Sequence, residues 1–283
     1  MAKLKIGKLV VIGTGLIGGS FALALKEAGA VVRVLGLGRS QVNLRRALEL
    51  KIIDAPGALD AATFGDADLV LLAVPVGQMQ GVMRAIAPFL GPKTIVTDAG
   101  STKQDVVALA RRELKGSLSR FVPGHPIAGT EKSGARAAFA ALYRERKGVL
   151  TPLKGTDAEA LSRVRSAWES CGAKVFELAP GEHDAVLAGV SHLPHVLAFA
   201  LVDQVARHKD ASRRFAYAAG GFRDFTRIAS SSPEMWRDIC LANRKALLAE
   251  LGRYRGELGR VERMLERGDA RALEALFSGA REA

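Results

Sequence analysis

Three glycines near the start of the chain have the spacing of a turn that binds phosphate groups. Gly13, Gly15 and Gly18 form the pattern G-x-G-x-x-G, which follows the apolar run LVVI and opens a stretch with helical character. The first glycine permits a tight turn, the second lets a pyrophosphate approach the backbone, and the third lets helix and strand pack closely. The start of the helix adds amide donors and the positive end of its dipole. The predicted dinucleotide contacts are Gly13, Gly15, Leu16, Ile17 and Gly18; the alternative is a glycine-rich structural turn.

The end of the second predicted strand distinguishes between the two nicotinamide dinucleotides. An NAD site usually carries a carboxylate there, which binds the ribose hydroxyls. Residues 34–40 read VLGLGRS and contain no acid. Arg39 can donate charge-assisted hydrogen bonds to a 2′-phosphate, with the Ser40 hydroxyl beside it. We therefore predict NADP as the preferred cofactor and NAD as the alternative; the competing interpretation is that Arg39 only begins the next helix in solvent.

His125 is the candidate group for proton transfer. It lies in the segment GHPIAG, just beyond a predicted strand, and doubly wound sheets bind their ligands at the carboxyl ends of strands. A neutral imidazole suits a general base because its intrinsic pKa lies near working pH. A structural loop histidine is the alternative. Val74 ends one predicted strand, and we expect it to contact the cofactor. Ser101 lies in a loop that follows another predicted strand.

The elements that must position these groups alternate between strand and helix over the first 180 residues. The alternation of short apolar runs with helical patterns indicates βαβ units on one parallel sheet. The predicted strands are Lys8–Gly13, Val31–Leu35, Leu69–Val74, Thr94–Asp98, Phe121–Pro123, Gly148–Thr151 and Lys174–Leu178, with helices such as Gly19–Ala28 and Lys103–Leu114 between them. The predicted fold is an α/β Rossmann-type doubly wound parallel sheet.

After about Pro180 no convincing strand follows, and an all-α domain is predicted. Helical patterns cover Asp184–Val205, Trp236–Leu251 and Glu257–Leu265, with Pro194 expected to kink or interrupt the first. A helix that is apolar on most of its circumference needs burial on more than one side. We therefore predict domains at 1–180 and 181–283, and a homodimer formed through the helical domain.

Composition restricts the class of protein and its partners. The net charge of +12 is spread among acidic residues with no aromatic platform between them, so we expect solvated faces and no nucleic-acid partner. The two cysteines have no metal-ligand spacing, so no metal is expected. Glycines interrupt the apolar N-terminal stretch, and no other run is judged long enough for a membrane span. These features favour a soluble, cytoplasmic protein, and the positive charge would raise its encounter rate with a small anionic substrate.

Further motifs resemble those of one enzyme family. The segments are DAGSTK at 98–103, GHPIAGTEKSG at 124–134, SHLPH at 191–195, GFRDFTR at 221–227 and the pair Met235-Trp236. Together they resemble the prephenate/arogenate (cyclohexadienyl) dehydrogenases of tyrosine biosynthesis, in the family's order, from about residue 8 to 260. The resemblance implies an oxidative decarboxylation in which a hydride leaves for the nicotinamide and the ring becomes aromatic.

The resemblance also implies roles for individual residues. His125 is similar to the catalytic histidine that acts on the substrate hydroxyl, and Ser101 to the serine that orients it and approaches the nicotinamide. From its position alone, Ser101 can equally be the N-cap of the helix that begins near Lys103. Arg227 matches an arginine that binds a substrate carboxylate, while Arg223 stands where some relatives have lysine.

The remaining implied substrate contacts are His192, His195, Thr130 and Glu131. The two histidines lie one helical turn apart and are expected to face the substrate between the domains; core histidines or a metal pair are the alternatives, and no third metal ligand follows. Thr130 and Glu131 match residues beside the active-site entrance, and Glu131 is expected to pair with an active-site arginine there.

Two other functions fit part of the pattern. A β-hydroxyacid dehydrogenase or an imine reductase would share the two-domain build, but would place a lysine, or no histidine, at position 125. A non-catalytic NADP sensor would bind an acidic partner or nucleic acid without turnover, and its binding would be sensitive to salt.

Overall fold

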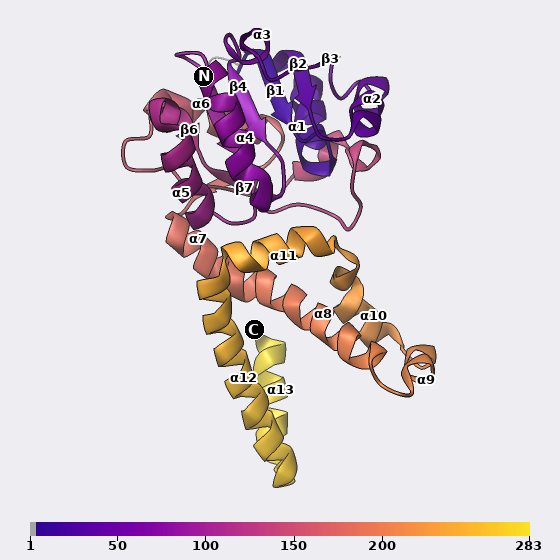
Figure 1. Cartoon of the computed structure of the whole chain (residues 1–283). Coiled ribbons are helices and arrows are strands. Elements are labelled where there is room, and N and C mark those ends of the chain that lie inside the picture. Colours follow the sequence, from indigo (N-terminus) through magenta and orange to yellow (C-terminus); the bar gives the residue numbers. More distant parts are fainter. Residues whose placement is uncertain (1–3) are drawn as a thin grey trace.

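The α/β part of the protein contains one six-stranded parallel sheet. The computed structural model describes residues 4–283, and in it the sheet lies above a helical part (Figure 1). The strands are β1 (Ile6–Ile12), β2 (Val31–Leu37), β3 (Ala55–Pro56), β4 (Leu69–Leu72), β5 (Ile95–Asp98) and β6 (Phe121–Val122). Their order is β3-β2-β1-β4-β5-β6, with every pairing parallel. The order reverses between β1 and β4, where doubly wound sheets bind ligands.

Helices cover the sheet and explain why its central strands are apolar throughout. They are α1 (Leu16–Glu27), α2 (Gln41–Glu49), α3 (Ala61–Phe64), α4 (Met79–Ile86), α5 (Gln104–Glu113) and α6 (Ala158–Ser170). Every residue of β4 and β5 is buried. A parallel sheet covered on both faces has such continuous apolar strands. The predicted doubly wound fold is thus confirmed.

A second, three-stranded sheet corrects the expectation of a single sheet. β7 (Gly124–Pro126) pairs antiparallel with β8 (Lys147–Leu150), which pairs parallel with β9 (Lys174–Glu177). Pro123 has no amide N–H with which to continue the β6 ladder. The chain changes sheet there, and His125 pairs with Val149. His125 therefore lies on a strand and not in the loop that the sequence suggested.

The helical part begins with one long, nearly continuous helix. α7 (Pro180–Leu187) passes through a π-helical turn, Ala188–His192, into α8 (Leu193–Ala206). Pro194 was expected to interrupt this helix, but it lies in the first turn of α8, where the π turn accommodates its missing N–H. The remaining helices are α9 (Ala211–Ala216), α10 (Gly220–Thr226), α11 (Pro233–Ala242), α12 (Arg244–Glu266) and α13 (Ala270–Glu282). The helix predicted over 236–251 is divided at Asn243.

The long helix Pro180–Ala206 is also apolar enough to cross a membrane by length and composition, which the sequence analysis did not anticipate. Only 28% of its most apolar stretch is buried within the chain. It nevertheless carries buried polar side chains, His183, Asp184 and His192, which belong to the site described below. A helix that packs within a soluble assembly satisfies the same criterion.

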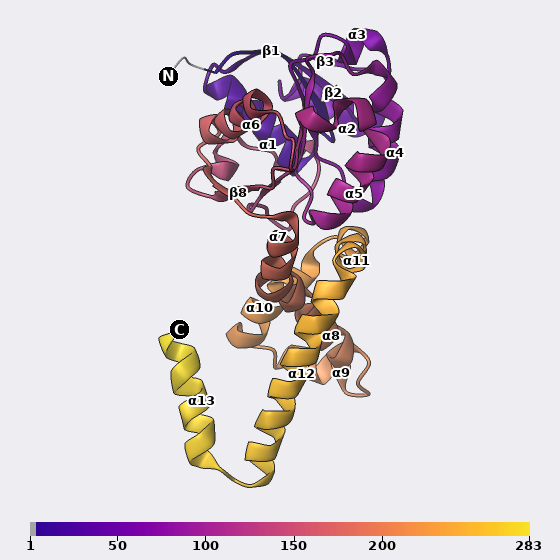
Figure 2. The same cartoon turned by 90° about the vertical axis from the view of Figure 1, so that its left-hand side faces the viewer.

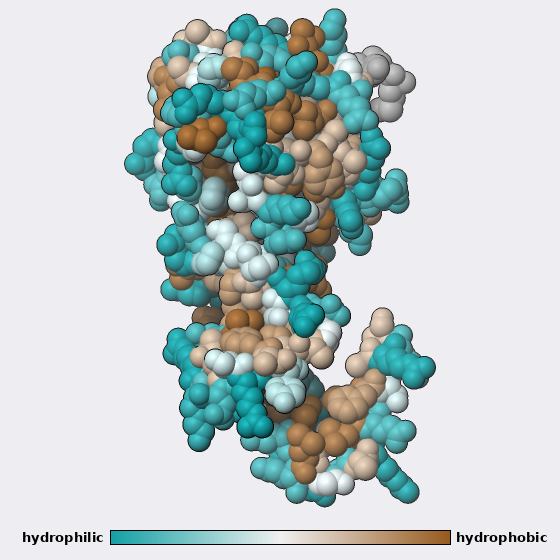
Figure 3. Space-filling view, turned by 90° about the vertical axis from the view of Figure 1, so that its right-hand side faces the viewer, coloured by the Kyte–Doolittle hydropathy of each residue, from teal (hydrophilic) through white to brown (hydrophobic). Residues whose placement is uncertain are grey.

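The C-terminal helices extend away from the rest of the molecule. α12 runs outward from the base of the α/β part, and α13 folds back beside it as a helical hairpin (Figures 1 and 2). Apolar side chains gather on the inner side of this hairpin (Figure 3). Leu265 and Phe277 are among the exposed apolar residues of these helices. This surface is therefore uncovered in the single chain.

Candidate active site

The glycine turn after β1 has the shape of a dinucleotide cradle. Gly13 has φ +100°, and a Cβ placed on it would lie 2.2 Å from the carbonyl oxygen of Ala73. A Cβ on Gly18 would lie 2.1 Å from the Gly13 carbonyl oxygen, so the third glycine lets α1 pack against the turn. A Cβ on Gly15 would instead meet nothing closer than 3.9 Å. The second glycine thus leaves space for a ligand above the backbone, as a bound pyrophosphate requires.

The predicted partners of the cofactor surround this turn. Leu16 and Ile17 begin α1, whose N-cap residue Gly15 offers no side-chain cap, so its first amides are available to an anion. Val74 follows β4, and its Cγ1 lies 3.3 Å from the Cβ position built on Gly13. The residues therefore fit the pyrophosphate of a dinucleotide cofactor.

The end of β2 carries no carboxylate. Arg39 is exposed, and its side chain has no charged or hydrogen-bonding partner within residues 4–283. The Ser40 hydroxyl accepts a hydrogen bond from the amide of Asn43 at 3.2 Å and so caps α2. A pocket beside it is lined mainly by polar and basic residues, which include Ser40, Arg45, Arg46 and Arg136.

His125 is joined to a histidine that the sequence analysis did not select. Its Nδ1 lies 2.9 Å from Nε2 of His183, and His183 Nδ1 lies 2.8 Å from Oδ1 of Asp184. Both partners come from α7 in the helical part, and both are buried. A signal for them was present in the sequence, because a His-Asp pair begins an otherwise apolar helix.

The electrostatic surroundings keep His125 neutral. Burial lowers the pKa of its imidazole well below the usual 6.5; the neighbouring His183 ring disfavours a second positive charge beside it, and the Lys103 ammonium lowers the pKa further. Asp184 has a pKa below its usual value: burial would raise it, but hydrogen bonds from His183 and from the amides of Gln104 and Lys103 outweigh burial. A neutral imidazole is thus connected to an ionised carboxylate, the state that a general base requires.

A buried ion pair fixes the backbone beside His125. Lys103 and Asp98 are both fully buried, and the Lys103 ammonium contacts the Asp98 carboxylate. The same ammonium donates to the Gly124 carbonyl at 2.7 Å, while the Asp98 carboxylate accepts from the amides of Gly124 at 3.1 Å and Gly100 at 2.8 Å. Both peptide groups of Gly124 are therefore held, and β7 enters the site at a fixed position.

Ser101 lies in the β5–α5 loop, half-buried, and its hydroxyl has no hydrogen-bond partner among the described residues. It does not cap α5, contrary to one of the sequence interpretations. The first amides of this helix, those of Lys103 and Gln104, donate to the Asp184 carboxylate at 2.7 and 2.9 Å. Asp184 supplies the cap from another domain, which local sequence could not indicate. An orienting contact from Ser101 to His125 remains a prediction.

His192 and His195 lie close to Trp236 between the two parts of the molecule. His192 is buried and its Nδ1 accepts from the Asn243 amide at 3.1 Å, while burial lowers its pKa to about 4. His195 stacks on Trp236 with ring centroids 3.6 Å apart, and its Nδ1 donates to the Ser191 carbonyl at 2.9 Å. Its Nε2 is therefore an unprotonated acceptor. No group of three or more potential metal ligands occurs in residues 4–283.

The two predicted substrate arginines differ in their surroundings. Arg227 follows α10 and lies 3.7 Å from the carboxylate of Glu131, so the predicted pair of opposite charges is present. The pKa of His195 is below its usual value, chiefly because the ring is buried. The hydrogen bond to Ser191 opposes this shift, and the charge of Arg227 adds to it. Arg223, on the preceding helix, is exposed and has no ion-pair partner among the described residues. The Thr130 hydroxyl accepts from the Lys132 amide at 3.2 Å within the same loop as Glu131.

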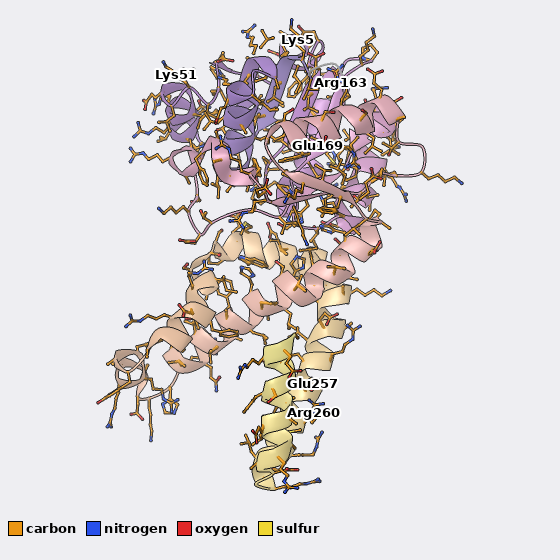
Figure 4. All side chains as sticks on the ribbon, turned by 180° about the vertical axis from the view of Figure 1, so that it is seen from behind. Lys5, Lys51, Arg163, Glu169, Glu257 and Arg260 are labelled. Carbon is orange, nitrogen blue, oxygen red and sulfur yellow. The ribbon has the colours of Figure 1, made fainter. Side chains whose placement is uncertain are left out.

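Much of the charge elsewhere lies on outer faces. Lys5, Lys51 and Arg163 project from the periphery of the α/β part (Figure 4). On α12, Glu257 and Arg260 form an ion pair with an N–O distance of 3.2 Å. These charges lie on the outer faces of the molecule, and the chemistry-bearing residues are concentrated between the two parts.

Comparisons with known proteins agree with this arrangement. Residues 21–177 match the nucleotide-binding domain of prephenate dehydrogenase and residues 179–279 its dimerization domain. The prephenate dehydrogenase of Bacillus subtilis is 37% identical over 97% of this chain and 74% of its own length. The cyclohexadienyl dehydrogenase of Zymomonas mobilis is 38% identical over 89% and 86%. The solved prephenate dehydrogenase from A. aeolicus, in complex with hydroxyphenyl propionate and NAD+, superposes with a TM-score of 0.91 at 36% identity over 99% of this chain and 98% of that one.

Proposed function

Because this chain belongs to the prephenate dehydrogenase family, we propose that it oxidises and decarboxylates prephenate, arogenate or both. The products are 4-hydroxyphenylpyruvate from prephenate and tyrosine from arogenate. One observation carries the assignment: a neutral imidazole, His125, is linked to a buried carboxylate close to the end of the parallel sheet that carries the glycine cradle.

The residues of the chain meet each requirement of this reaction. His125 accepts the hydroxyl proton at Nε2, because its Nδ1 is engaged with His183. A nicotinamide held by the glycine turn would supply the acceptor for the hydride of the carbinol carbon. The bond between the ring and its carboxylate then breaks, CO₂ leaves, and the electron pair of that bond completes the aromatic ring as a phenolate. The protonated His125 returns its proton to the phenolate oxygen, which gives the phenol product and restores the neutral imidazole. Arg227 binds a substrate carboxylate, a task that suits a bidentate guanidinium, with Arg223 as a second cation.

His192, His195, Thr130 and Glu131 complete the proposed substrate site. His195 offers an unprotonated Nε2, and its stacking on Trp236 holds the ring in one orientation. The pair between Glu131 and Arg227 is largely exposed and therefore weak, so an entering carboxylate can displace Glu131. We propose that this exchange gates access to the site, with Thr130 shaping the loop that carries Glu131.

NADP is the proposed preferred cofactor. The absence of an acid after β2 and the position of Arg39 and Ser40 support it, as do Arg45 and Arg136 in the neighbouring pocket. A carboxylate would repel a 2′-phosphate, whereas guanidinium groups bind it. Gly13, Gly15, Leu16, Ile17, Gly18, Val74 and Ser101 are the proposed contacts to the rest of the dinucleotide.

A homodimer through the helical domain, residues 181–283, is part of the proposal. The long helix Pro180–Ala206 leaves most of its apolar surface uncovered, with Val190 at 73% exposure. The α12–α13 hairpin adds Leu258, Leu265 and Phe277 to the uncovered apolar surface. A second copy would bury these side chains. Each Å² of apolar surface removed from water would stabilise the dimer by about 25 cal/mol. Residues 1–180 form the cofactor domain, and the protein is proposed to work in the cytoplasm.

Initial rates with both substrates crossed against both cofactors test the proposal. We expect NADPH to appear at 340 nm with prephenate, arogenate or both. Cofactor binding without turnover of either substrate would indicate a sensor, and turnover of a β-hydroxy acid or an imine would indicate the other enzyme classes. Either result would overturn the proposed function.

A further inference from the structure

We propose that His183 and Asp184 are positioning residues that set the tautomer of His125 and stabilise the positive charge that develops on it. This inference rests on the proposed function, in which His125 accepts the hydroxyl proton. It adds two residues of α7, in the helical domain, to the site that surrounds His125 on β7.

The hydrogen bonds determine which nitrogen of each ring carries the proton. Asp184 is ionised and can only accept, so Nδ1 of His183 donates to it at 2.8 Å. Nε2 of His183 is then an acceptor, and the contact of 2.9 Å requires Nδ1 of His125 to donate. The lone pair of His125 is consequently left on Nε2, where it can accept a proton from substrate. Without His183, nothing among these contacts selects this tautomer.

Asp184 is held firmly enough to serve this purpose. Its two carboxylate oxygens accept from the amides of Lys103 and Gln104, and its backbone carbonyl accepts from Asn243 Nδ2 at 2.7 Å. Lys103 is also the residue whose ammonium holds Gly124 beside His125. The same turn therefore fixes both the strand that carries His125 and the carboxylate at the end of the histidine chain.

The electrostatic consequence resembles that of a buried carboxylate behind a catalytic histidine in hydrolases. There the carboxylate orients the imidazole and stabilises the imidazolium without itself becoming protonated. Here His183 transmits the effect, because a proton gained by His125 at Nε2 strengthens the donation from Nδ1 to His183. The arrangement is complete only when the two domains are in contact, since His125 lies on β7 and His183 on α7.

Two substitutions of His183 separate the parts of this arrangement. His183→Asn retains a donor near the Nδ1 position, toward Asp184, but does not reach His125. His183→Gln places an amide oxygen near the Nε2 position and keeps an acceptor for His125, but loses the link to Asp184. We expect kcat to fall about 100-fold in the first variant and about 10-fold in the second, with KM and cofactor affinity changed little.

His208→Asn and His208→Gln are matched controls, because His208 lies at the far end of the helical part and contacts the exposed Arg214. The double variant His125→Asn/His183→Asn tests whether His183 acts through His125. If it does, the double variant turns over at the rate of His125→Asn alone.

Nitrogen-15 labelling of histidine gives a readout that does not depend on turnover, because the chain has only five histidines. We expect His125 to carry its proton on Nδ1 in the unaltered protein and in His183→Gln, and to lose that preference in His183→Asn. His125 with its proton on Nε2 in the unaltered protein would overturn the inference. A kcat for His183→Asn within about threefold of the unaltered enzyme, with His125→Asn strongly impaired, would also overturn it. The inference would fail as well if His183→Asn lowered kcat by the same factor in the His125→Asn background as in the unaltered enzyme. Full turnover by His125→Asn would instead overturn the proposed function.

Discussion

Replacement of Lys103 by methionine tests the buried ion pair that fixes the strand carrying His125. Methionine has nearly the same length and shape, so the substitution removes the charge and the hydrogen bonds without leaving a large cavity. Lys103 and Asp98 are both fully buried, so the Asp98 carboxylate would lose its counter-ion without gaining solvent. The carbonyl of Gly124 would lose its donor at 2.7 Å as well.

The magnitude follows from what remains around the carboxylate. Breaking one half of a buried ion pair costs about 3–5 kcal/mol. Asp98 keeps the amide donors of Gly100 and Gly124, which places the expected loss near the lower end, at about 3 kcal/mol. Lys26→Met is the control, because Lys26 forms an ion pair with Asp54 that is partly exposed; it should cost less than about 1 kcal/mol.

Urea unfolding followed by circular dichroism measures both free energies of unfolding. The variant Lys103→Met should also lower kcat more than it raises KM, since β7 and His125 lose their fixed position. A loss of stability no larger than that of Lys26→Met would refute the account of the Lys103–Asp98 pair. Unchanged kcat in a folded Lys103→Met protein would show that this pair does not position His125.

Three further predictions concern the site. Arg227→Ala should chiefly raise KM in steady-state kinetics, because it removes a contact to a substrate carboxylate. A variant whose kcat falls while its KM is unchanged would contradict this role. Arg39→Asp should shift the ratio of kcat/KM values from NADP toward NAD, and an unaltered ratio would show that Arg39 does not recognise the 2′-phosphate. Because burial lowers the pKa of His125 well below 6.5, and because the neutral form is the active base, kcat/KM should persist as the pH falls below 6.5 and decline only at lower pH. A decline of kcat/KM on the acidic side that is centred at or above pH 6.5 would contradict a lowered pKa for His125.

Local patterns in the sequence were sufficient to predict the cofactor domain. The glycine turn at Gly13–Gly18 and the alternation of apolar strands with helices depend on neighbouring residues, and both predictions agree with the structure. The separate β7–β9 sheet was missed because β7 follows almost directly after β6 and was not recognised as a strand of its own, and because β8 pairs with β7 and with β9 outside the main sheet. The apolar pattern of a strand does not specify which sheet it joins.

The connections of the site were harder to predict than its residues. His183 and Asp184 lie next to each other in a helix and resemble ordinary polar residues of a first turn. Their partners, His125 and the amide of Lys103, lie 58 and 81 positions away in the sequence. Ser101 was a plausible cap for α5 on local grounds, but the carboxylate of Asp184 occupies that position. Tertiary contacts across a domain boundary decide such cases.

The rate of His125→Asn with prephenate and arogenate, measured alongside cofactor dissociation by fluorescence titration, tests the central claim most directly. An imidazole that accepts the hydroxyl proton predicts a fall in kcat of about 100-fold or more, with the cofactor dissociation constant near that of the unaltered enzyme. Unchanged kcat in a folded His125→Asn protein would contradict the account.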